Sequence, residues 1–439
     1  MFDPEQLIDE IVAFSGIKKI WVAYSGGVDS HVLLHALATS QQRLPSLHAV
    51  HINHNLHKNS ADWAECCAHN AKILNVDFIS LSVAVDGSDG GVEAAARTAR
   101  YQALRSLITE GELLVTAQHQ EDQAETLLLQ LLRGAGPKGL SGMPKQTAFS
   151  EGNLMRPLLA VSQAEILDYA RQHNLQWVED PSNLETRWNR NYLRHKIWPQ
   201  IVARWPSAAR TISRSARHCA ETTELLAVLA EQDLVNIDVD KTADSLPVSG
   251  ILSLSDIRCR NLLRYWVEKK GFRLPSTDQL QRVISEVCLA SEDSSPILAW
   301  EGVEVRRYQD RLYFHSPLKP HDREKFFYWQ GKERLDLDDG RSVLWQQRQG
   351  DGLAQSLLEH GVTIRFRIGG ERIQLHGHHH HKSLKHLFQE WKIPPWERDR
   401  IPLIYSGENL IAITGHAVDE SFAVASDETG YFPVLNTMY

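Results

Sequence analysis

The residues best suited to chemistry in this sequence stand together in one short glycine-rich segment. Its members are Ser25, Gly26, Gly27, Val28, Asp29 and Ser30. Two adjacent glycines let backbone N–H groups approach an anion closely, and the serine hydroxyls at both ends add donors. A carboxylate beside a phosphate requires a cation, so Asp29 predicts bound Mg²⁺. The alternative is an ordinary strand-to-helix turn with a serine or aspartate as the helix N-cap.

A pair of carboxylates forms the second candidate site. Asp122 and Glu125 are three residues apart and follow the apolar run 113–117. In a helix this spacing places both side chains on one turn. Two carboxylates near a phosphate-binding loop suit a metal ion or an ammonium group. Acidic residues also favour the first turn of any helix, which is the structural alternative.

A basic stretch follows in a chain whose net charge is −8. Residues 186–220 contain no aspartate or glutamate. The cations of this stretch are Arg187, Arg190, Arg194, Lys196, Arg204, Arg210, Arg214 and Arg217. Such a concentration is typical of a site for a phosphate-rich ligand, and from charge alone an ordinary solvated helix face explains it equally well.

The elements that must position these residues alternate between strand and helix in the first half of the chain. Apolar runs at 19–24, 47–53, 76–83 and 113–117 are separated by helical patterns. This alternation predicts an α/β domain with a doubly wound, mainly parallel sheet. Ligands of such sheets bind beyond the carboxyl ends of the strands, where both candidate sites fall.

The second half predicts two smaller domains. Helical patterns at 255–270 and 277–289 indicate a mainly helical middle domain, and short apolar runs around a helix at 383–391 indicate a small α+β C-terminal domain. We expect a catalytic domain at 1–215, a middle domain at 216–320, a linker at 321–361 and a C-terminal domain at 362–439.

The composition argues against several classes of protein. No apolar run is long enough for a membrane span, and the acidic N-terminus lacks the pattern of a signal peptide. The five cysteines form no CxxC pair, so we expect no zinc site, no iron–sulfur cluster and no disulfide framework. These features predict a reduced cytoplasmic protein. The absence of a GxxxxGK[ST] sequence argues against an ordinary P-loop kinase or ATPase.

The glycine-rich segment 25–30 resembles the SGGxDS signature of the PP-loop ATP pyrophosphatases, which cleave ATP between the α and β phosphates. The stretch 51–56 resembles the one that this family places near adenine and ribose, which implies that Ile52 contacts ATP. Asn55 stands where the family usually has glycine, and His57 where it usually has arginine.

Further segments resemble the lysidine synthetase family of these enzymes. In the first half they are 91–101 (GxEAAAR then RY), 119–126 (HxxDDQxET, with Glu121 in place of the first aspartate) and 190–194 (RNxxR). In the C-terminal part they are 366–371, 384–390 and 393–398, which are similar to RxGGE, LKxLFxE and IPPWxR.

The resemblance implies an enzyme that adenylates the wobble cytidine in the CAU anticodon of tRNA(Ile) and attaches free L-lysine to it. The implied substrates are ATP with Mg²⁺, L-lysine and the tRNA, with no membrane partner, and a homodimer is left open. The implied catalytic residues are Asp29, Arg97, Asp122, Glu125 and Arg190. The implied ATP contacts are Ser25, Gly26, Gly27, Val28, Asp29, Ser30 and Ile52. Asp29 and Asp122 are the implied Mg²⁺ ligands, and Arg194, Lys385 and Arg398 are the implied tRNA contacts.

Other readings of the same loop remain open at this point. Thiolating relatives usually carry catalytic or cluster-binding cysteine pairs, and amidotransferase relatives need a glutaminase domain; neither pattern occurs here. An RNA-binding protein with an inactive nucleotide site is a different class. An ATP–pyrophosphate exchange assay separates that class from the enzyme.

Overall fold

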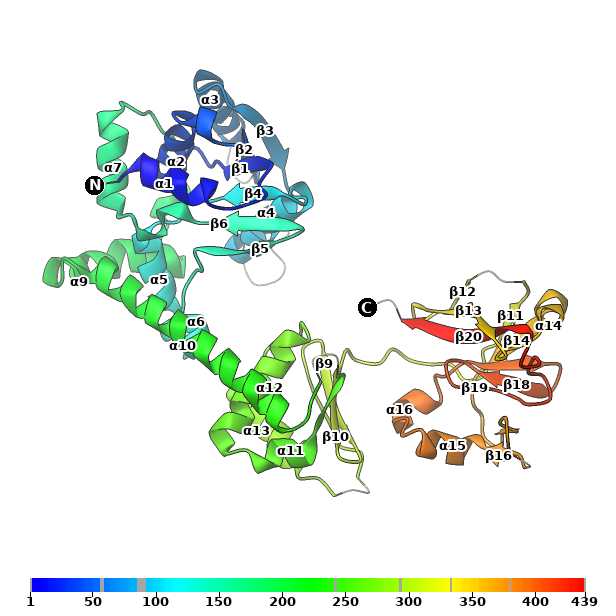
Figure 1. Ribbon diagram of the computed structural model, residues 1–439. Helices are drawn as coiled ribbons and strands as arrows, with labels where there is room; N and C mark the ends of the chain where they lie inside the picture. The colour runs from blue at the N-terminus through cyan, green and yellow to red at the C-terminus, as the bar shows by residue number, and fades with distance from the viewer. Residues whose placement is uncertain are drawn as a thin grey trace. The chain divides into compact units, whose positions relative to one another are not determined.

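The computed structural model describes residues 2–55, 59–84, 92–240, 243–291, 294–331, 334–378 and 380–437. His57 and Gly91 therefore lie outside the described residues. The chain divides into two compact units, Met1–Val228 and Leu229–Tyr439, and Figure 1 shows their elements. Among the described residues, no helix is both long and apolar enough to cross a membrane.

The first unit is built on a six-stranded sheet, as the alternating pattern predicts. Its strands lie in the order β3 (Asp77–Ser82), β2 (Ser46–Asn53), β1 (Lys19–Ala23), β4 (Glu112–Val115), β6 (Gly152–Met155) and β5 (Gln146–Phe149). All neighbouring pairs are parallel except β5 with β6. The prediction of a mainly parallel sheet is confirmed.

Helices surround this sheet. The α-helices of the unit are α1 (Pro4–Val12), α2 (Val28–Ala38), α3 (Ser60–Ile73), α4 (Val92–Leu107), α5 (Gln120–Leu131), α6 (Pro137–Leu140), α7 (Gln163–Gln172), α8 (Asn189–Tyr192), α9 (Trp198–Arg204) and α10 (Ala208–Asn236), the last of which continues into the second unit. Short 3-10 turns lie at Gln41–Arg43, Pro157–Ala160 and Pro181–Leu184, and a π-helical turn at Leu193–Ile197.

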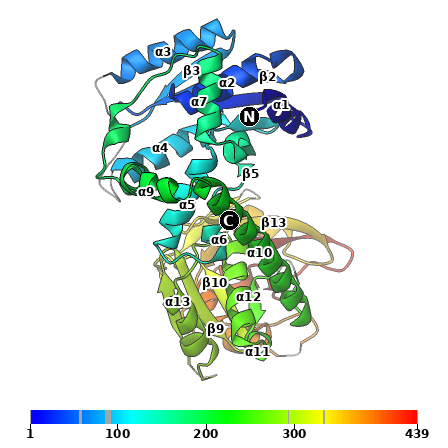
Figure 2. The ribbon, with the colours of Figure 1, turned by 90° about the vertical axis from the view of Figure 1, so that its left-hand side faces the viewer.

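Both faces of the sheet are covered, because its central strand is apolar on both sides. Ile20 and Val22 of β1 pack in a core with α1, α2 and α7. Trp21, between them, points to the opposite face and packs in a second core with Leu104 of α4. This arrangement is what a buried parallel strand requires, and Figure 2 shows helices on both sides of the sheet.

The strand order places two chain segments beside each other at one edge of the sheet. From β1 the chain passes to β2 and β3 on one side, and then returns to β4 on the other side of β1. The segments that leave β1 and β4 therefore diverge at the switch point, where ligands of open α/β sheets bind. The glycine-rich segment leaves β1, and the acidic segment 119–126 leaves β4.

The second unit begins with a helical layer on a small antiparallel sheet. The helices are α11 (Val248–Ser253), α12 (Asp256–Lys269) and α13 (Thr277–Arg282), which continues as a π-helical turn to Cys288. The strands lie in the order β7 (Ser245–Pro247), β10 (Arg311–His315), β9 (Val303–Tyr308) and β8 (Ile297–Trp300). Trp266 of α12 is fully buried in the core between the two layers.

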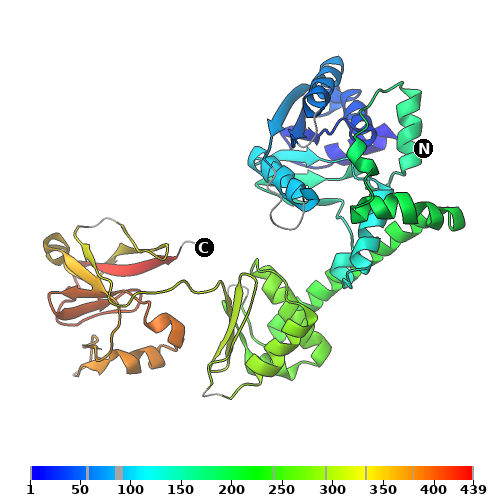
Figure 3. The same cartoon turned by 180° about the vertical axis from the view of Figure 1, so that it is seen from behind.

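The rest of the second unit is rich in strands and also contains short helices, as Figure 3 shows. One sheet contains β11 (Phe327–Trp329), β14 (Val362–Arg365), β17 (Leu403–Ser406), β18 (Asn409–Ile413) and β19 (Ala417–Val418). The others contain β12 (Leu335–Asp336), β13 (Arg341–Gln349) and β20 (Thr429–Thr437), and β15 (Arg372–Ile373) with β16 (Lys382–Ser383). The helices are α14 (Gln355–His360), α15 (Leu384–Glu390) and α16 (Pro395–Arg398).

The expected linker at 321–361 is wrong. Strand β13 pairs with β20 along its whole length, from Arg341 to Gln349, and β11 pairs with β14. Trp329 and Trp345 stack with ring centroids 4.1 Å apart, so the segment forms part of the C-terminal core. Its many polar residues conceal the strands in the sequence, because β13 is buried mainly near its start.

Candidate active site

The glycine-rich segment lies where β1 ends and α2 begins. Gly26 has a φ of +85°, and a Cβ at this position would lie 2.8 Å from the Cys67 sulfur. Its carbonyl oxygen accepts a hydrogen bond from the Val178 N–H at 3.0 Å. Backbone conformation and lack of space therefore both require glycine here.

Ser25 and Ser30 tie the two ends of the loop together. Ser25 N–H donates to Ser30 Oγ at 3.2 Å, and Ser30 Oγ donates to the Gly27 carbonyl at 3.0 Å. Gly27 is the N-cap of α2 and has no side chain to bond the first-turn N–H groups. This helix terminus therefore keeps its partial positive charge available to an anion.

Asp29 lies in the first turn of α2, and its two oxygens differ. Oδ2 is 3.8 Å from Nε2 of His119, whereas Oδ1 is buried and has no hydrogen-bond partner. Burial raises the pKa of the Asp29 carboxyl, and the neighbouring charge of His119 opposes this rise. A buried carboxylate oxygen without a donor is an atom that a cation would satisfy.

His119 joins Asp29 to the acid pair that follows β4. Its side chain is only 2% exposed; Nδ1 is 3.0 Å from Glu121 Oε2, and Nε2 is 3.4 Å from Asp122 Oδ2. Burial alone lowers the pKa of His119, but the hydrogen bond with Glu121 and the charges of Asp122 and Asp29 raise it above its ordinary value. The ring thus brings two carboxylates from different elements to one nitrogen.

Glu121 connects His119 to the neighbouring helix. Its Oε2 also accepts a hydrogen bond from the Gln163 N–H, at 2.9 Å, at the first residue of α7. The longer side chain of glutamate, where the family pattern has aspartate, reaches both partners. Glu121 and His119 were not predicted as site residues from the sequence. Their place in the motif beside Asp122 was the available signal.

Asp122 and Glu125 lie on one turn of α5, as their spacing predicts, but their partners are two arginines. The Glu125 carboxylate accepts hydrogen bonds from Arg190 Nε at 2.9 Å and from Arg194 Nε at 2.7 Å. Asp122 Oδ1 accepts hydrogen bonds from the guanidinium groups of Arg190 at 3.1 Å and Arg194 at 2.8 Å. We call these four residues the acid–arginine cluster. Arg194, expected at the tRNA, therefore has its guanidinium directed to the acid pair.

The charges of the acid–arginine cluster balance each other in a largely buried place. The Glu125 side chain is 1% exposed and that of Asp122 is 15% exposed. Burial raises the pKa of Asp122, but His119, Arg190 and Arg194 lower it below its usual range. The carboxylate of Asp122 is therefore held as an anion by close guanidinium groups.

A magnesium ion fits the atoms present around Asp29. No group of three or more His, Cys, Asp or Glu side chains in the described part of the chain is arranged to hold a metal. Mg²⁺ needs fewer protein ligands when ATP is present, because phosphates and water complete its octahedron. The unpartnered Oδ1 of Asp29 and the adjacent carboxylate of Asp122 meet this smaller requirement.

Arg97 and Ile52 lie away from these contacts. Arg97, on α4, lies over the Tyr101 ring at 5.0 Å and lines a hollow of about 530 Å³. Ile52, on β2, packs against the core on the α4 side of the sheet. The Glu93 side chain, four residues before Arg97, lies outside the described residues.

Asn55 follows β2 with a φ of +53°. Glycine adopts this left-handed conformation freely, and asparagine is among the few other residues that tolerate it. Its N–H bonds the Asn53 side chain at 2.9 Å, which stabilises the turn. The replacement of the family's usual glycine is therefore compatible with the same backbone path.

The two candidate tRNA contacts in the second unit differ in exposure and bonding. Lys385 is exposed on α15, opposite the buried Leu384 and Phe388. Arg398 is half-buried; its Nε donates to the Ile393 carbonyl at 2.8 Å, and its guanidinium donates to the Tyr308 hydroxyl at 2.7 Å. Arg398 thus has internal partners in this unit, whereas Lys385 faces solvent.

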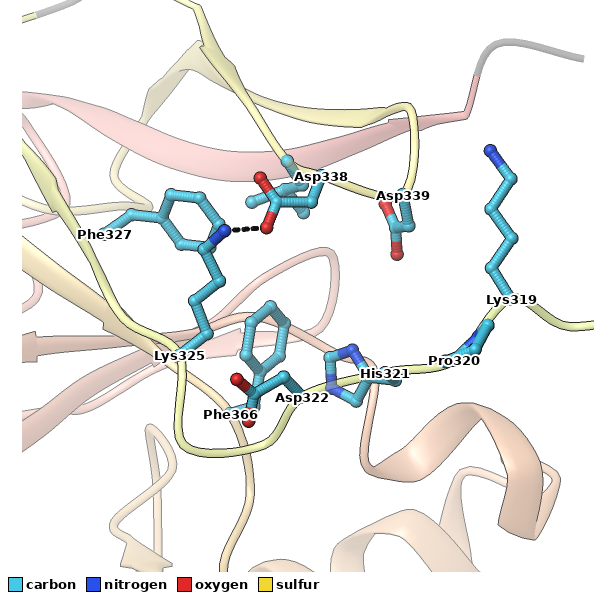
Figure 4. A pocket seen from close by; sticks show the side chains of 10 residues that line it. Lys319, Pro320, His321, Asp322, Lys325, Phe327, Asp338, Asp339 and Phe366 are labelled. Atoms are coloured by element: carbon cyan, nitrogen blue, oxygen red, sulfur yellow. Dashed lines mark hydrogen bonds and ion pairs between the residues drawn. The ribbon is translucent and has the colours of Figure 1, made fainter.

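The second unit also contains a pocket of about 340 Å³ with mixed charges (Figure 4). Lys325 pairs there with Asp338, and Asp339 bonds the guanidinium of Arg341. The ring of His321 packs edge-on against Phe366, with 4.3 Å between centroids. Because most of its charged groups pair with each other, this pocket gives no indication of an ion-binding site.

The match to family models follows the chain in three parts. Residues 3–201 match the PP-loop domain, residues 246–313 the TilS substrate binding domain, and residues 362–435 the TilS substrate C-terminal domain. The tRNA(Ile)-lysidine synthase of Coxiella burnetii is 43% identical, with 98% of this chain and 96% of the relative covered. The chain belongs to the tRNA(Ile)-lysidine synthase family.

A further relative is similar over most of the chain, and two solved structures are similar to parts of it. The tRNA(Ile)-lysidine synthase of Pectobacterium atrosepticum is 40% identical, with 95% of this chain and 94% of that protein covered. Among solved structures, a TilS C-terminal domain is 21% identical with a TM-score of 0.22, covering 26% of this chain and 99% of that one. The U34-tRNA thiolase NcsA of Methanococcus maripaludis is 14% identical with a TM-score of 0.42, covering 50% and 78%.

Proposed function

We propose that this enzyme joins free L-lysine to C2 of the wobble cytidine in the CAU anticodon of tRNA(Ile), with ATP converted to AMP and pyrophosphate. The product is lysidine, which changes the codon read from AUG to AUA and the amino-acid identity from methionine to isoleucine. The observation that carries the proposal is the arrangement of Asp29, His119 and Asp122 beside an uncapped helix terminus, in a chain that matches this family along nearly its whole length.

The first step is adenylation of the base. The O2 atom of cytidine attacks the α-phosphorus of ATP, and pyrophosphate leaves. The protein contributes by positioning the phosphates and neutralising their charge. Ser25, Ser30 and the first-turn N–H groups of α2 bind phosphate oxygens, and Asp29 Oδ1 with Asp122 would hold Mg²⁺. When bound, this ion supplies further charge neutralisation.

The second step replaces AMP by lysine. The ε-amine attacks C2 and AMP leaves with the former O2 atom. The amine must lose a proton, although an unperturbed lysine has a pKa of about 10.4. Asp122 or Glu125 binds the ammonium group and accepts that proton. The amine competes there with Arg190 and Arg194, which already contact both carboxylates.

The remaining assignments are part of the same proposal. Arg97 and Arg190 contact substrate phosphates, and Gly26, Gly27, Val28 and Ile52 line the ATP site. Lys385 binds tRNA, with Arg194 and Arg398 as further candidates. The enzyme acts in the cytoplasm.

A single incubation tests the reaction. Purified protein is mixed with ATP, Mg²⁺, radiolabelled lysine and unmodified tRNA(Ile) carrying the CAU anticodon. We expect label in the tRNA that resists mild alkaline deacylation and disappears when the anticodon cytidine is replaced. Pyrophosphate release without lysine transfer would retain the ATP chemistry and reject lysine as the second substrate. Neither label nor pyrophosphate would reject the proposal.

A further inference from the structure

A hollow on the α4 side of the first unit has a charge pattern unlike that of the acid–arginine cluster. Of the six described residues that line it, three are arginines, Arg97, Arg105 and Arg156, and none of the six carries a carboxylate. The other lining residues are Thr98, Tyr101 and Gln102. We call this site the arginine hollow. Three like charges repel each other unless an anion lies among them.

Arg156 gives the strongest indication that an anion binds here. The residue is only 7% exposed, and its Nε atom is buried without a hydrogen-bond partner. Its Nη1 donates to the Pro144 carbonyl at 2.8 Å, which is a neutral partner. Burial lowers the pKa of Arg156, the hydrogen bond of its side chain with Tyr101 opposes this fall, and the nearby charge of Arg97 adds to it. Buried charges in proteins are normally paired with an opposite charge, so a buried guanidinium with neutral partners and an unsatisfied Nε indicates an anionic ligand.

Aromatic rings support the other two guanidiniums. Arg97 lies over Tyr101 at 5.0 Å, and Arg105 lies over Phe149 at 5.1 Å. The two rings contact each other edge-on with centroids 6.0 Å apart. Stacked guanidiniums lose little conformational freedom on binding, and their planar N–H groups match phosphate oxygens.

We propose that the arginine hollow is a phosphate-binding site in which Arg105 and Arg156 act together with Arg97. Two sources supply this chemistry: a phosphodiester of the RNA strand next to the modified base, or the pyrophosphate released from ATP. The proposal rests on the proposed function for the identity of these sources, whereas a phosphate site itself follows from the charges of the three arginines and the burial of Arg156.

Binding measurements on the full-length protein test this without turnover. Arg105→Gln removes an exposed charge, and Arg156→Lys keeps the charge but shortens its reach. Arg171→Gln is the matched control, because Arg171 is exposed in the same unit and pairs with the equally exposed Asp168 at 3.1 Å. The affinity for unmodified tRNA(Ile) is measured against KCl concentration, and the affinity for inorganic pyrophosphate is measured by calorimetry.

An RNA phosphate in the hollow predicts that Arg105→Gln lowers the slope of log Kd against log [KCl] by about 0.7. Pyrophosphate in the hollow instead predicts weaker calorimetric binding, by roughly tenfold, with the tRNA slope unchanged. Either result supports the phosphate site and identifies its source. If Arg105→Gln and Arg156→Lys both match Arg171→Gln in the two measurements, the proposal is overturned. Failure of lysine transfer by the wild-type protein would reject the proposed function. The binding measurements would still decide whether the hollow binds phosphate, because they need no turnover.

Discussion

The acid–arginine cluster and the arginine hollow lie in the same unit and use the same side chain in opposite ways. In the cluster, Arg190 and Arg194 meet Asp122 and Glu125 at 2.7 to 3.1 Å, so that the charges balance without any ligand. In the hollow, none of the described lining residues carries a carboxylate, and the Nε of Arg156 has no hydrogen-bond partner.

This difference separates arginines that stabilise the fold from arginines whose charge is paired only when a ligand binds. A balanced buried network is costly to disturb, because removing one member leaves another charge unpaired. An unbalanced group of cations contributes little to stability, because part of its interaction energy is realised only when an anion binds. Stability and binding measurements should therefore separate the two sites.

The largest effect is expected at Asp29, which lies beside the cluster but outside its ion pairs. Asp29→Ala removes the unpartnered Oδ1 that we assign to the cation, so adenylation should fall by at least about 10³-fold. The arginine pairs stay intact, and the urea midpoint of the first unit should change little. Pyrophosphate release is the measurement, with Asp168→Ala on α7 as an exposed control. Normal release by Asp29→Ala would remove this residue from the chemistry.

A change within the cluster should affect stability most. Glu125→Gln leaves Arg190 and Arg194 with one carboxylate between them, and unfolding should become easier by about 3 kcal/mol. Urea denaturation followed in the first unit measures this. The control is Glu221→Gln, whose exposed carboxylate is 3.9 Å from Arg217 and contributes less than about 0.5 kcal/mol. Equal midpoints for the two variants would show that the cluster is not a structural network.

An intermediate effect is expected at Glu121, which orients His119 rather than contacting substrate. Glu121→Gln weakens the bond to Nδ1 and should lower kcat about tenfold while the KM for ATP stays within about twofold. Glu121→Asp, the residue of the family pattern, should restore much of kcat if its carboxylate reaches His119. A change in the KM for ATP with kcat unchanged would contradict a positioning role.

The sequence predicts the architecture of the first unit well, because its strands are apolar on both faces and its helices carry regular apolar spacing. Both candidate sites fall at the carboxyl ends of β1 and β4, as expected for such a sheet. The linker prediction failed at β13, where Gln346, Gln347 and Arg348 give a strand a polar appearance while it pairs with β20. Pairing between segments some ninety residues apart leaves no local signal.

The partners of the charged site residues were also beyond the sequence. Spacing along α5 placed Asp122 and Glu125 together, but only the fold brings Arg190 and Arg194 to them from a different helical segment. Arg156 differs from Arg190 and Arg194, because the fold brings it to other cations. It has no basic neighbours in the sequence, but it lines the hollow together with Arg97 and Arg105. A cluster of basic residues in the sequence predicts a site for an anion, but only tertiary contacts show whether each cation is already paired with a carboxylate.

The smallest effects are expected in the second unit, where the same distinction separates Lys385 from Arg398. Lys385 is exposed, so Lys385→Gln should weaken tRNA binding about twofold to fivefold and reduce the salt slope by up to about 0.9, with the unfolding midpoint unchanged. Arg398→Gln should instead cost about 1 kcal/mol of stability, because it removes the bonds to the Ile393 carbonyl and the Tyr308 hydroxyl. Filter binding across KCl concentrations and urea denaturation measure the two quantities on both variants. If Arg398→Gln reduced the salt slope as much as Lys385→Gln without loss of stability, internal bonding would not exclude a phosphate contact, and the distinction drawn from the first unit would fail in the second.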